Sequence, residues 1–179
     1  GLDGPLTEAL RRRGFEPVSC TVVNDAPPPE PEPLARAAQN LEAYQWLVVA
    51  SRRAVAALLE ARGGKPLPAS LRTAAVGAKT AARLAAGGAD SPLTAPGAGA
   101  AALIEALRGA DRWPGRRVLI PRALEGGREL GQSLRHWGAC VDEVVAYRTL
   151  ERPPDEIIGA WDAARPAAVV VASPSAARA

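Results

Sequence analysis

Three turns in this sequence share one design, with a hydroxyl group and backbone amides where a helix is expected to start after a strand. The three turns are Ala50-Ser51-Arg52-Arg53-Ala54, Val76-Gly77-Ala78-Lys79-Thr80-Ala81 and Ala172-Ser173-Pro174-Ser175-Ala176. Helix N-termini attract anions, and open α/β sheets bind ligands outside the carboxyl ends of their strands. Simple N-capping would explain any single turn. The three together favour a cleft between two domains that binds carboxylates or phosphates.

The usual catalytic side chains are scarce. His136 is the single histidine and is expected late in a helix, at the surface, which leaves no His-based triad and no His-rich metal site. Neither a G-x-x-x-x-G-K-[ST] loop nor a G-x-G-x-x-G fingerprint follows a predicted strand. Tyr147 is the candidate that stands out, at the end of a long predicted strand. Its position is equally consistent with facing the cleft and with packing on a hinge.

Composition and charge narrow the function further. The chain has 179 residues, 47% of them apolar and 4% aromatic, with a formal charge of +3. The single run of three basic residues, Arg11–Arg13, suits a helix end better than a nucleic-acid surface. The apolar stretches of the sequence are too short to span a bilayer. A mild positive charge suits an anionic small-molecule substrate. Cys20 and Cys140 are expected as buried thiols in a reducing cytosol.

Two short patterns recur in the same order and at nearly the same offset, which indicates a duplicated half. The segment Trp46–Ala54 is similar to Ala168–Ala176. Four residues of an early helix, Leu6, Leu10, Arg11 and Gly14, recur as Leu130, Leu134, Arg135 and Gly138. The counterpart of the strand before the later helix would precede Gly1, and the continuation of the last copy would follow Ala179. Because methionine is also absent, we expect a fragment that is cut at both ends.

Helices and strands are expected to alternate along the chain. Helices are predicted near 4–13, 33–42, 51–62, 78–86, 99–108, 127–137 and 155–164, and strands at 17–23, 45–50, 73–76, 116–121, 141–150 and 167–172. Such alternation implies βα units and a mostly parallel sheet. Proline-rich connectors bracket residues 34–145, which we expect to form a complete second domain. The expected first domain is incomplete and comprises residues 1–19 and 155–179, with interdomain linkers at 20–33 and 146–154.

An ordered set of motifs extends along nearly the whole chain. The motifs are Val48-Val-Ala-Ser-Arg-Arg-Ala-Val55, Ala75-Val-Gly-Ala-Lys-Thr-Ala81, Gly127-Arg-Glu-Leu130, Gly138-Ala139 with Val141 and Val144, Ala146-Tyr-Arg-Thr149 and Val171-Ala-Ser-Pro-Ser-Ala176. This succession resembles the uroporphyrinogen-III synthase family, although no single motif is specific. The resemblance implies two similar parallel-sheet α/β domains joined by a two-stranded linker, with the second domain inserted into the first.

The resemblance also implies a reaction and a set of site residues. The reaction is cyclisation of hydroxymethylbilane to uroporphyrinogen III, with loss of water and inversion of ring D, in the cleft between the domains and without a metal or organic cofactor. Tyr147 corresponds to the tyrosine that assists departure of the substrate hydroxyl. Positions implied to hold the substrate carboxylates, largely through main-chain amides, are Ser51, Arg53, Gly77, Ala78, Thr80, Arg128, Ser173 and Ser175. Arg122 departs from the family spacing, so no role is assigned to it.

Two alternatives are compatible with the residues. A non-catalytic ligand-binding or regulatory module could use the same duplicated fold, and a winged-helix-like segment after Ala179 would favour it. A periplasmic anion-binding protein is the other alternative, against which the lack of an export signal counts. The leading expectation is a cytoplasmic, monomeric lyase of tetrapyrrole and heme biosynthesis. It would act on a small linear tetrapyrrole and have no nucleic-acid or membrane partner.

Overall fold

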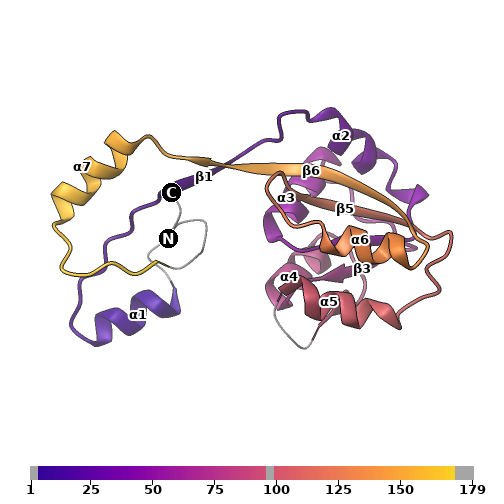
Figure 1. The fold of residues 1–179 in the computed structure, drawn as a ribbon, viewed down its shortest axis with the longest axis horizontal. Coiled ribbons are helices and arrows are strands. Elements are labelled where there is room, and N and C mark those ends of the chain that lie inside the picture. The colour runs from indigo at the N-terminus through magenta and orange to yellow at the C-terminus, as the bar shows by residue number, and fades with distance from the viewer. Residues whose placement is uncertain (1–3, 96–98, 172–179) are drawn as a thin grey trace. The chain divides into compact units, whose positions relative to one another are not determined.

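The computed structural model describes residues 4–95 and 99–171, and the chain divides into two compact units (Figure 1). Unit 2 is the continuous stretch Ala26–Arg148, whereas unit 1 combines Gly1–Asp25 with Thr149–Ala179. Every buried hydrophobic residue in the described part of the chain lies in unit 2. Unit 2 therefore holds the hydrophobic core and the sheet that positions the candidate site.

The strands form a single six-stranded sheet. They are β1 (Val23–Ala26), β2 (Trp46–Val49), β3 (Arg72–Ala75), β4 (Leu93–Thr94), β5 (Arg117–Ala123) and β6 (Cys140–Glu151), in the order β1-β6-β5-β2-β3-β4. Parallel pairings join β2 through β6. All four residues of β2 are buried, as expected for a parallel strand that is covered on both faces. The prediction of an α/β protein with a mostly parallel sheet is confirmed.

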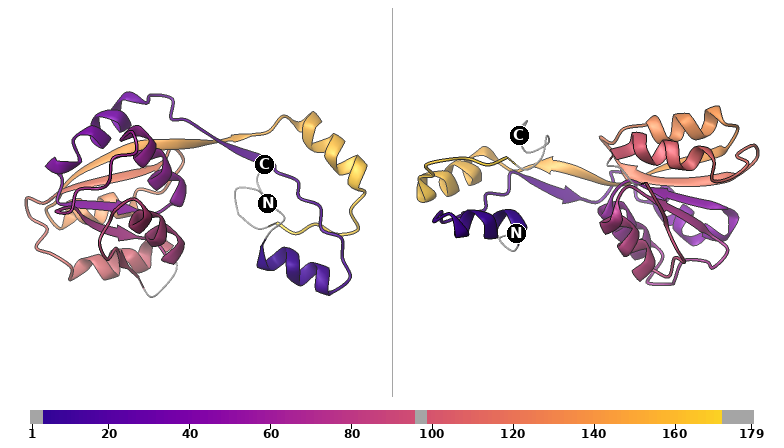
Figure 2. Two further views of the ribbon diagram at one scale, coloured as in Figure 1. Left: turned by 180° about the vertical axis from the view of Figure 1, so that it is seen from behind. Right: turned by 90° about the horizontal axis from the view of Figure 1, so that it is seen from below.

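Helices cover both faces of the sheet in unit 2 (Figure 2). The first face carries α2 (Glu32–Gln39), α3 (Arg52–Ala61) and α4 (Ala78–Ala86), and the second carries α5 (Gly99–Arg108) and α6 (Glu129–His136). Successive residues of a strand point to opposite faces. Accordingly Leu47 of β2 packs in one core with Leu58 of α3, whereas Val48 packs in the other with Leu103 of α5. Burying each such leucine contributes roughly 1.5–3 kcal/mol.

The strand order contains one point at which the direction of winding reverses. The chain passes from β2 outward to β3 and β4, then returns to place β5 on the other side of β2 and β6 beyond it. The helices that follow β2 and β5, α3 and α6, consequently lie on opposite faces of the sheet. In doubly wound sheets the crevice outside the carboxyl ends of such a strand pair is the usual ligand site. The carboxyl ends of β2 and β5 are therefore where a site is expected.

The described residues of unit 1 include the helices α1 (Pro5–Arg12) and α7 (Pro154–Ala164). No residue of α1 is buried, and Trp161 of α7 is 46% exposed. Arg152 connects the two segments of this unit, because its backbone N–H donates to Val22 O at 2.9 Å and its guanidinium donates to Thr21 O at 3.3 Å. The described residues of unit 1 are thus joined by the hydrogen bonds of Arg152 and include no buried hydrophobic residue.

Several elements differ from the sequence prediction. The strand predicted at 17–23 begins only at Val23, and residues 167–171 form no strand. A strand needs a neighbouring strand, and residues 15–21 and 167–171 have none among the described residues. The short strand β4, Leu93–Thr94, lies between the helices predicted at 78–86 and 99–108, where no strand was predicted. Cys20 and Cys140 are exposed, not buried, because Cys20 lies in that strand-free stretch and Cys140 starts β6.

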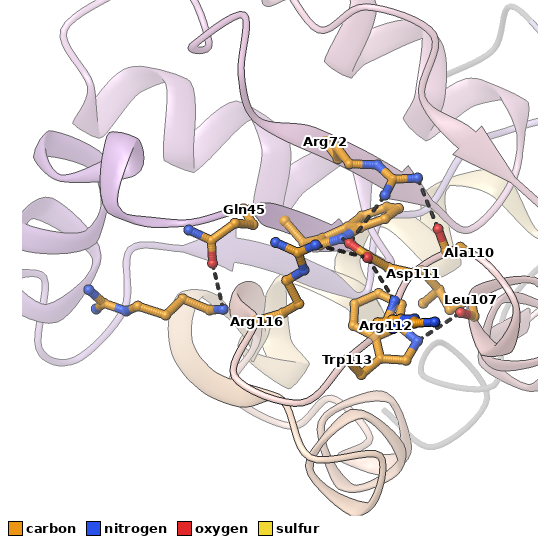
Figure 3. A network of polar contacts seen from close by, with 10 residues as sticks. Gln45, Arg72, Leu107, Ala110, Asp111, Arg112, Trp113 and Arg116 are labelled. Atoms are coloured by element: carbon orange, nitrogen blue, oxygen red, sulfur yellow. Dashed lines mark hydrogen bonds and ion pairs between the residues drawn. The ribbon is translucent and has the colours of Figure 1, made fainter.

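A polar cluster lies at the amino-terminal edge of the sheet in unit 2 (Figure 3). The carboxylate of Asp111 accepts a hydrogen bond from Trp46 Nε1 at 2.9 Å and pairs with Arg72 and Arg116, each at 3.2 Å. The Arg72 guanidinium also stacks over the Trp46 ring at 4.2 Å from its centroid. Because Trp46 and Arg72 begin β2 and β3, this cluster joins the starts of two strands to the loop before β5.

Candidate active site at the carboxyl edge of the sheet

Ser51 starts α3 directly beyond the carboxyl end of β2. Its backbone is extended, with φ −142° and ψ 136°, and its Oγ accepts hydrogen bonds from Arg53 N at 3.1 Å and Ala54 N at 3.5 Å. This is the geometry of an N-cap, in which a serine oxygen satisfies amides that have no partner within the helix. The cap fixes the position of the serine hydroxyl at the point where the winding of the sheet reverses.

Tyr147 reaches the same edge from β6 because of a bulge. Upstream, Val144 packs in the core under α3, whereas Val141 packs in the core under α6. Strict alternation would turn odd-numbered residues, including Tyr147, toward α6. The pairing with β5 slips, however: Arg122 lies opposite Val145, and Ala123 lies opposite Tyr147. A β-bulge re-aims a side chain in this way, and Tyr147 packs against the core under α3.

The bulge brings the two hydroxyl groups together. Tyr147 Oη lies 3.0 Å from Ser51 Oγ, a hydrogen bond in a partly buried environment. The guanidinium carbon of Arg53 is 5.9 Å from the centroid of the Tyr147 ring. The backbone of Tyr147 is held as well, since its carbonyl accepts from Leu124 N at 2.9 Å. A phenol with a hydroxyl neighbour and a nearby cation can donate a proton and stabilise the resulting negative charge.

The second predicted turn presents backbone amides to a ligand, whereas its hydroxyl side chain is buried. Gly77 is the N-cap of α4, with φ +82° and ψ 156°, a conformation that glycine adopts without strain. Ala78, the first residue of the helix, is exposed, and the first amides of a helix have no partner within it. The side chain of Thr80, in contrast, is buried, with 5% of the residue exposed. The Thr80 hydroxyl therefore offers little surface to a ligand.

Arg128 lies elsewhere, at the N-cap of α6, where it lines a concavity of about 980 Å³ between α2 and α6 beside β6. Tyr44 lines the same concavity, and its hydroxyl donates to Asp142 Oδ2 at 2.8 Å. Burial and the Asp142 carboxylate raise the pKa of Tyr44 to about 12. No contact joins Arg128 to Ser51 or Tyr147 among the contacts of the described residues. The structure therefore does not group Arg128 with the other predicted site residues.

Arg122 stabilises the turn that follows β5. Its guanidinium Nη1 donates to the carbonyls of Ala123 at 2.8 Å and Leu124 at 3.1 Å, and its Nε lies 3.0 Å from Glu143 Oε2. Arg135 of α6 also pairs with Glu143. Arg122 thus holds the loop whose Leu124 amide anchors the Tyr147 carbonyl.

The contact between Ser51 and Tyr147 was not predicted from the sequence, although both residues were. Predicting this contact would have required knowledge of the register slip between β5 and β6. That slip depends on how two strands pair, which no local sequence pattern encodes. Ser173 and Ser175 of the third turn lie outside the described residues. Across residues 4–95 and 99–171, no cluster of three or more His, Cys, Asp and Glu side chains could hold a metal ion. No helix in this part of the chain has the length and apolar character needed to cross a bilayer.

Comparisons with known proteins point to one family. The family model described as uroporphyrinogen-III synthase HemD matches residues 4–179. A uroporphyrinogen-III synthase of Synechococcus elongatus is 32% identical over 163 residues, which cover 88% of this chain and 60% of that protein. This chain therefore spans about three fifths of the length of that relative.

Solved structures agree in fold. The uroporphyrinogen III synthase of the extremely thermophilic bacterium Thermus thermophilus is 25% identical, with a TM-score of 0.54 over 88% of this chain and 61% of that one. The uroporphyrinogen-III synthetase of Helicobacter pylori 26695 is 19% identical, with a TM-score of 0.55 over 88% of this chain and 67% of that one, and shows the fold alone. Since the family model and the Synechococcus elongatus relative are named as uroporphyrinogen-III synthases, a non-catalytic module on the same fold is not favoured.

Proposed function

Because the chain belongs to the uroporphyrinogen-III synthase family, we propose that its protein cyclises hydroxymethylbilane to uroporphyrinogen III, with loss of water and inversion of ring D. The observation that carries this proposal to particular residues is the pairing of Tyr147 Oη with Ser51 Oγ at 3.0 Å. The pair lies at the carboxyl edge of β2 and β5, where a doubly wound sheet binds its ligand.

Tyr147 is the proposed general acid. The substrate's C–O bond breaks with its electron pair leaving on oxygen, and the Tyr147 O–H proton converts the departing hydroxyl to water. Inversion requires that the substituted α-carbon of ring D forms the first new carbon–carbon bond. The bond from this carbon to its original methylene bridge then breaks, and the released methylene rejoins at the free α-carbon of the same ring. That carbon loses one proton when the pyrrole regains aromaticity, and the proton restores the phenol. Atoms and charge then balance without a metal or organic cofactor. A positioned acid of this kind contributes typically 10²–10⁴-fold to a rate.

Recognition of the substrate's carboxylates is proposed to rest on helix N-termini. The first amides of α4 have no partner within their helix and no side-chain cap, whereas the Arg53 and Ala54 amides of α3 already donate to Ser51 Oγ. At α3 the positive charge of Arg53 and the helix dipole can still attract an anion. Helix N-termini bind anions through amides and the helix dipole. Ser51, Gly77, Ala78 and Thr80 are the proposed contributors from these two turns. Arg128, Ser173 and Ser175 complete the proposed set of carboxylate-binding residues.

The organisation of the whole protein is also proposed from the family. Unit 2, Ala26–Arg148, is proposed to correspond to the inserted domain of residues 34–145. The first domain would then contain residues 1–19 and 155–179, with linkers at 20–33 and 146–154 forming a two-stranded connection. We propose a cytoplasmic monomer whose partner is the linear tetrapyrrole alone, with no nucleic-acid or membrane partner.

An isomer assay tests this function. Hydroxymethylbilane is supplied to the complete gene product, and the type I and type III uroporphyrinogens are separated after oxidation. Closure without inversion of ring D yields the type I isomer, so the enzyme is expected to direct most of the substrate to type III. A preparation of folded protein that leaves the isomer ratio equal to that of buffer alone would refute the proposed activity.

A further inference from the structure

The hydrogen bonds at Ser51 determine which hydroxyl of the pair acts as donor. A serine hydroxyl has one O–H and two acceptor lone pairs. Two backbone amides already approach Ser51 Oγ as donors, Arg53 N at 3.1 Å and Ala54 N at 3.5 Å. These amides occupy the acceptor side of the oxygen, so the serine's own proton is the group left for Tyr147 Oη at 3.0 Å. Amide donors also polarise the serine O–H and make it a better donor.

From this geometry, and resting on the proposed function, we propose that Ser51 is the positioning residue of Tyr147. Ser51 donates to Tyr147 Oη and so leaves the phenol O–H directed away from the protein, toward a substrate. When that proton has been given to the departing hydroxyl, the same Ser51 O–H stabilises the phenolate oxygen. Ser51 thus acts on the reaction through Tyr147. The N-cap hydrogen bonds from the first amides of α3 hold the Ser51 hydroxyl in the required orientation.

The β-bulge makes this arrangement possible. Without the slip that places Ala123 opposite Tyr147, the phenol would lie on the α6 face of the sheet and could not reach the start of α3. Strands β2 and β6 are thereby connected across the end of β5: β2 contributes Ser51 through the turn into α3, and β6 contributes Tyr147 opposite Ala123. The positioning role of Ser51 can be measured apart from the contribution to carboxylate binding proposed above, because loss of positioning lowers turnover whereas loss of carboxylate binding lowers substrate affinity.

Four substitutions distinguish the two roles of Ser51, which are to cap α3 and to donate a hydrogen bond to Tyr147. Ser51→Thr keeps both the cap and the donor. Ser51→Gly removes the hydroxyl but is a tolerated N-cap, and Ser51→Asp keeps a capping oxygen that cannot donate at neutral pH. Ser51→Ala removes both. Thermal unfolding of each variant checks the cap, and the Gly and Asp variants are expected to unfold within about 2 °C of the parent protein, because a few tenths of a kcal/mol shift the midpoint by that little.

Kinetics with hydroxymethylbilane then test the role. The value of kcat for type III formation is expected to fall about tenfold in Ser51→Gly with KM nearly unchanged, as for loss of a hydrogen bond to a developing charge. Ser51→Thr should recover most of that loss. In a Tyr147→Phe background, Ser51→Gly should have no further effect, because residues that act as one unit are not additive. Equal effects in both backgrounds, or an effect on KM alone, would overturn the positioning role.

A spectroscopic measurement makes the test independent of activity. The given sequence has two tyrosines, so Tyr44→Phe, with phenylalanine also at any tyrosine of the complete protein outside residues 1–179, leaves Tyr147 as the single source of the tyrosine Fermi doublet in the Raman spectrum. The intensity ratio of that doublet distinguishes a phenol oxygen that accepts a strong hydrogen bond from one that donates. We expect an acceptor-type ratio that Ser51→Gly abolishes and Ser51→Thr retains. A donor-type ratio overturns the proposed direction of the bond. An acceptor-type ratio in protein that forms no type III isomer refutes the proposed function instead, and the catalytic role of Ser51 with it.

Discussion

At the scale of single residues, Tyr147 shows how one irregularity in a strand can place a functional group. Its position late in a long strand could be predicted from the sequence, but position alone was equally consistent with facing a cleft and with packing on a hinge. In the structure the ring packs against the core under α3 while Oη contacts Ser51. The deciding feature is the slip between Arg122 and Ala123 in the pairing of β5 with β6. Non-local pairing of this kind leaves no local signal.

Tyr147→Phe is the most direct test of the proposed acid. The phenylalanine ring keeps the packing under α3, so the fold should be retained. The rate of enzymatic type III formation should fall roughly 10²-fold, typical of the loss of a general acid. Affinity for the product, measured by calorimetry, should change little, since the hydroxyl acts on the departing group. Turnover equal to that of the parent protein would remove Tyr147 from the mechanism.

Thr73 offers a test of stability at the same scale. Its Oγ1 is buried in β3 and has no hydrogen-bond partner among the described residues, and a hydroxyl in that state costs about 1–3 kcal/mol. Thr73→Val replaces it by a methyl group of similar shape and keeps the β-branch that suits a strand. We expect the free energy of unfolding in urea to rise by about 1 kcal/mol. Thr73→Ser, which keeps the hydroxyl and loses the methyl group, is the matched control and should be less stable than the parent.

At the scale of elements, helices were easier to predict than strands. The helices predicted at 78–86 and 99–108 agree with α4 and α5, and α1 ends as predicted near Gly14, whose φ of +82° suits a residue just beyond a helix. The residues that specify these helices and their ends lie within the helix or directly beside it. The strand predicted at 17–23 begins only at Val23, and the described part of the strand predicted at 167–172, residues 167–171, is not a strand. A strand also requires a neighbouring strand, which its own residues do not specify.

The amino-terminus of α4 tests whether amides or side chains bind the substrate. Ala78→Pro removes one outward-pointing amide at a position where proline is tolerated in a helix. Since helix-terminus contributions are roughly 0.3–1 kcal/mol each, Ser51→Ala or Thr80→Ala alone should weaken binding of a uroporphyrinogen analogue by about tenfold or less. Ala78→Pro should weaken it more. Loss of all binding in the alanine variants, with binding kept in the proline variant, would show that side chains carry recognition.

The polar cluster at the opposite edge of the sheet predicts an acid-sensitive stability. Burial of Asp111 would raise its pKa, but the hydrogen bonds from Trp46 and the Arg112 amide and the charges of Arg116 and Arg72 outweigh burial and hold that pKa below its ordinary value. A lowered pKa contributes stability that is present above the ordinary value near 4 and is lost as the pH falls through the folded value.

Asp111→Asn should therefore change the pH dependence of unfolding. At neutral pH we expect a loss of about 1–3 kcal/mol in urea unfolding, because two arginine pairs are broken while a hydrogen-bond acceptor remains. The difference between the variant and the parent should shrink as the pH falls to about 3. Glu105→Gln is a suitable control, since Glu105 forms only an exposed pair with Arg108, and such pairs contribute little. An equal loss at both pH values would contradict an electrostatic role for Asp111.

At the scale of the whole molecule, the two units differ in how they are held together. Unit 2 has two apolar cores on the two faces of its sheet, whereas α1 in unit 1 buries no residue and Trp161 and Ile158 of α7 are about half exposed. From the proline-rich connectors and the duplicated pattern the sequence predicted one continuous domain and one discontinuous, incomplete domain. It could not indicate how stable each part is, because stability depends on contacts that local patterns do not contain.

Amide hydrogen exchange measured on residues 1–179 should make this difference visible. The amides of β2 and of Val118–Ile120 in β5 are expected to exchange only through global unfolding of unit 2, since these residues are buried. The helices α1 and α7, with 8 and 11 residues, are shorter than the roughly 12–15 residues at which isolated helices become stable in water, so their amides should exchange at nearly unprotected rates. Leu58→Ala provides the matched control: loss of a buried leucine costs about 2–5 kcal/mol and should lower protection in β2 and β5 while α1 and α7 stay the same. Protection of α1 equal to that of β2 would mean that unit 1 buries its apolar side chains in solution, and the contrast between the units would then be wrong.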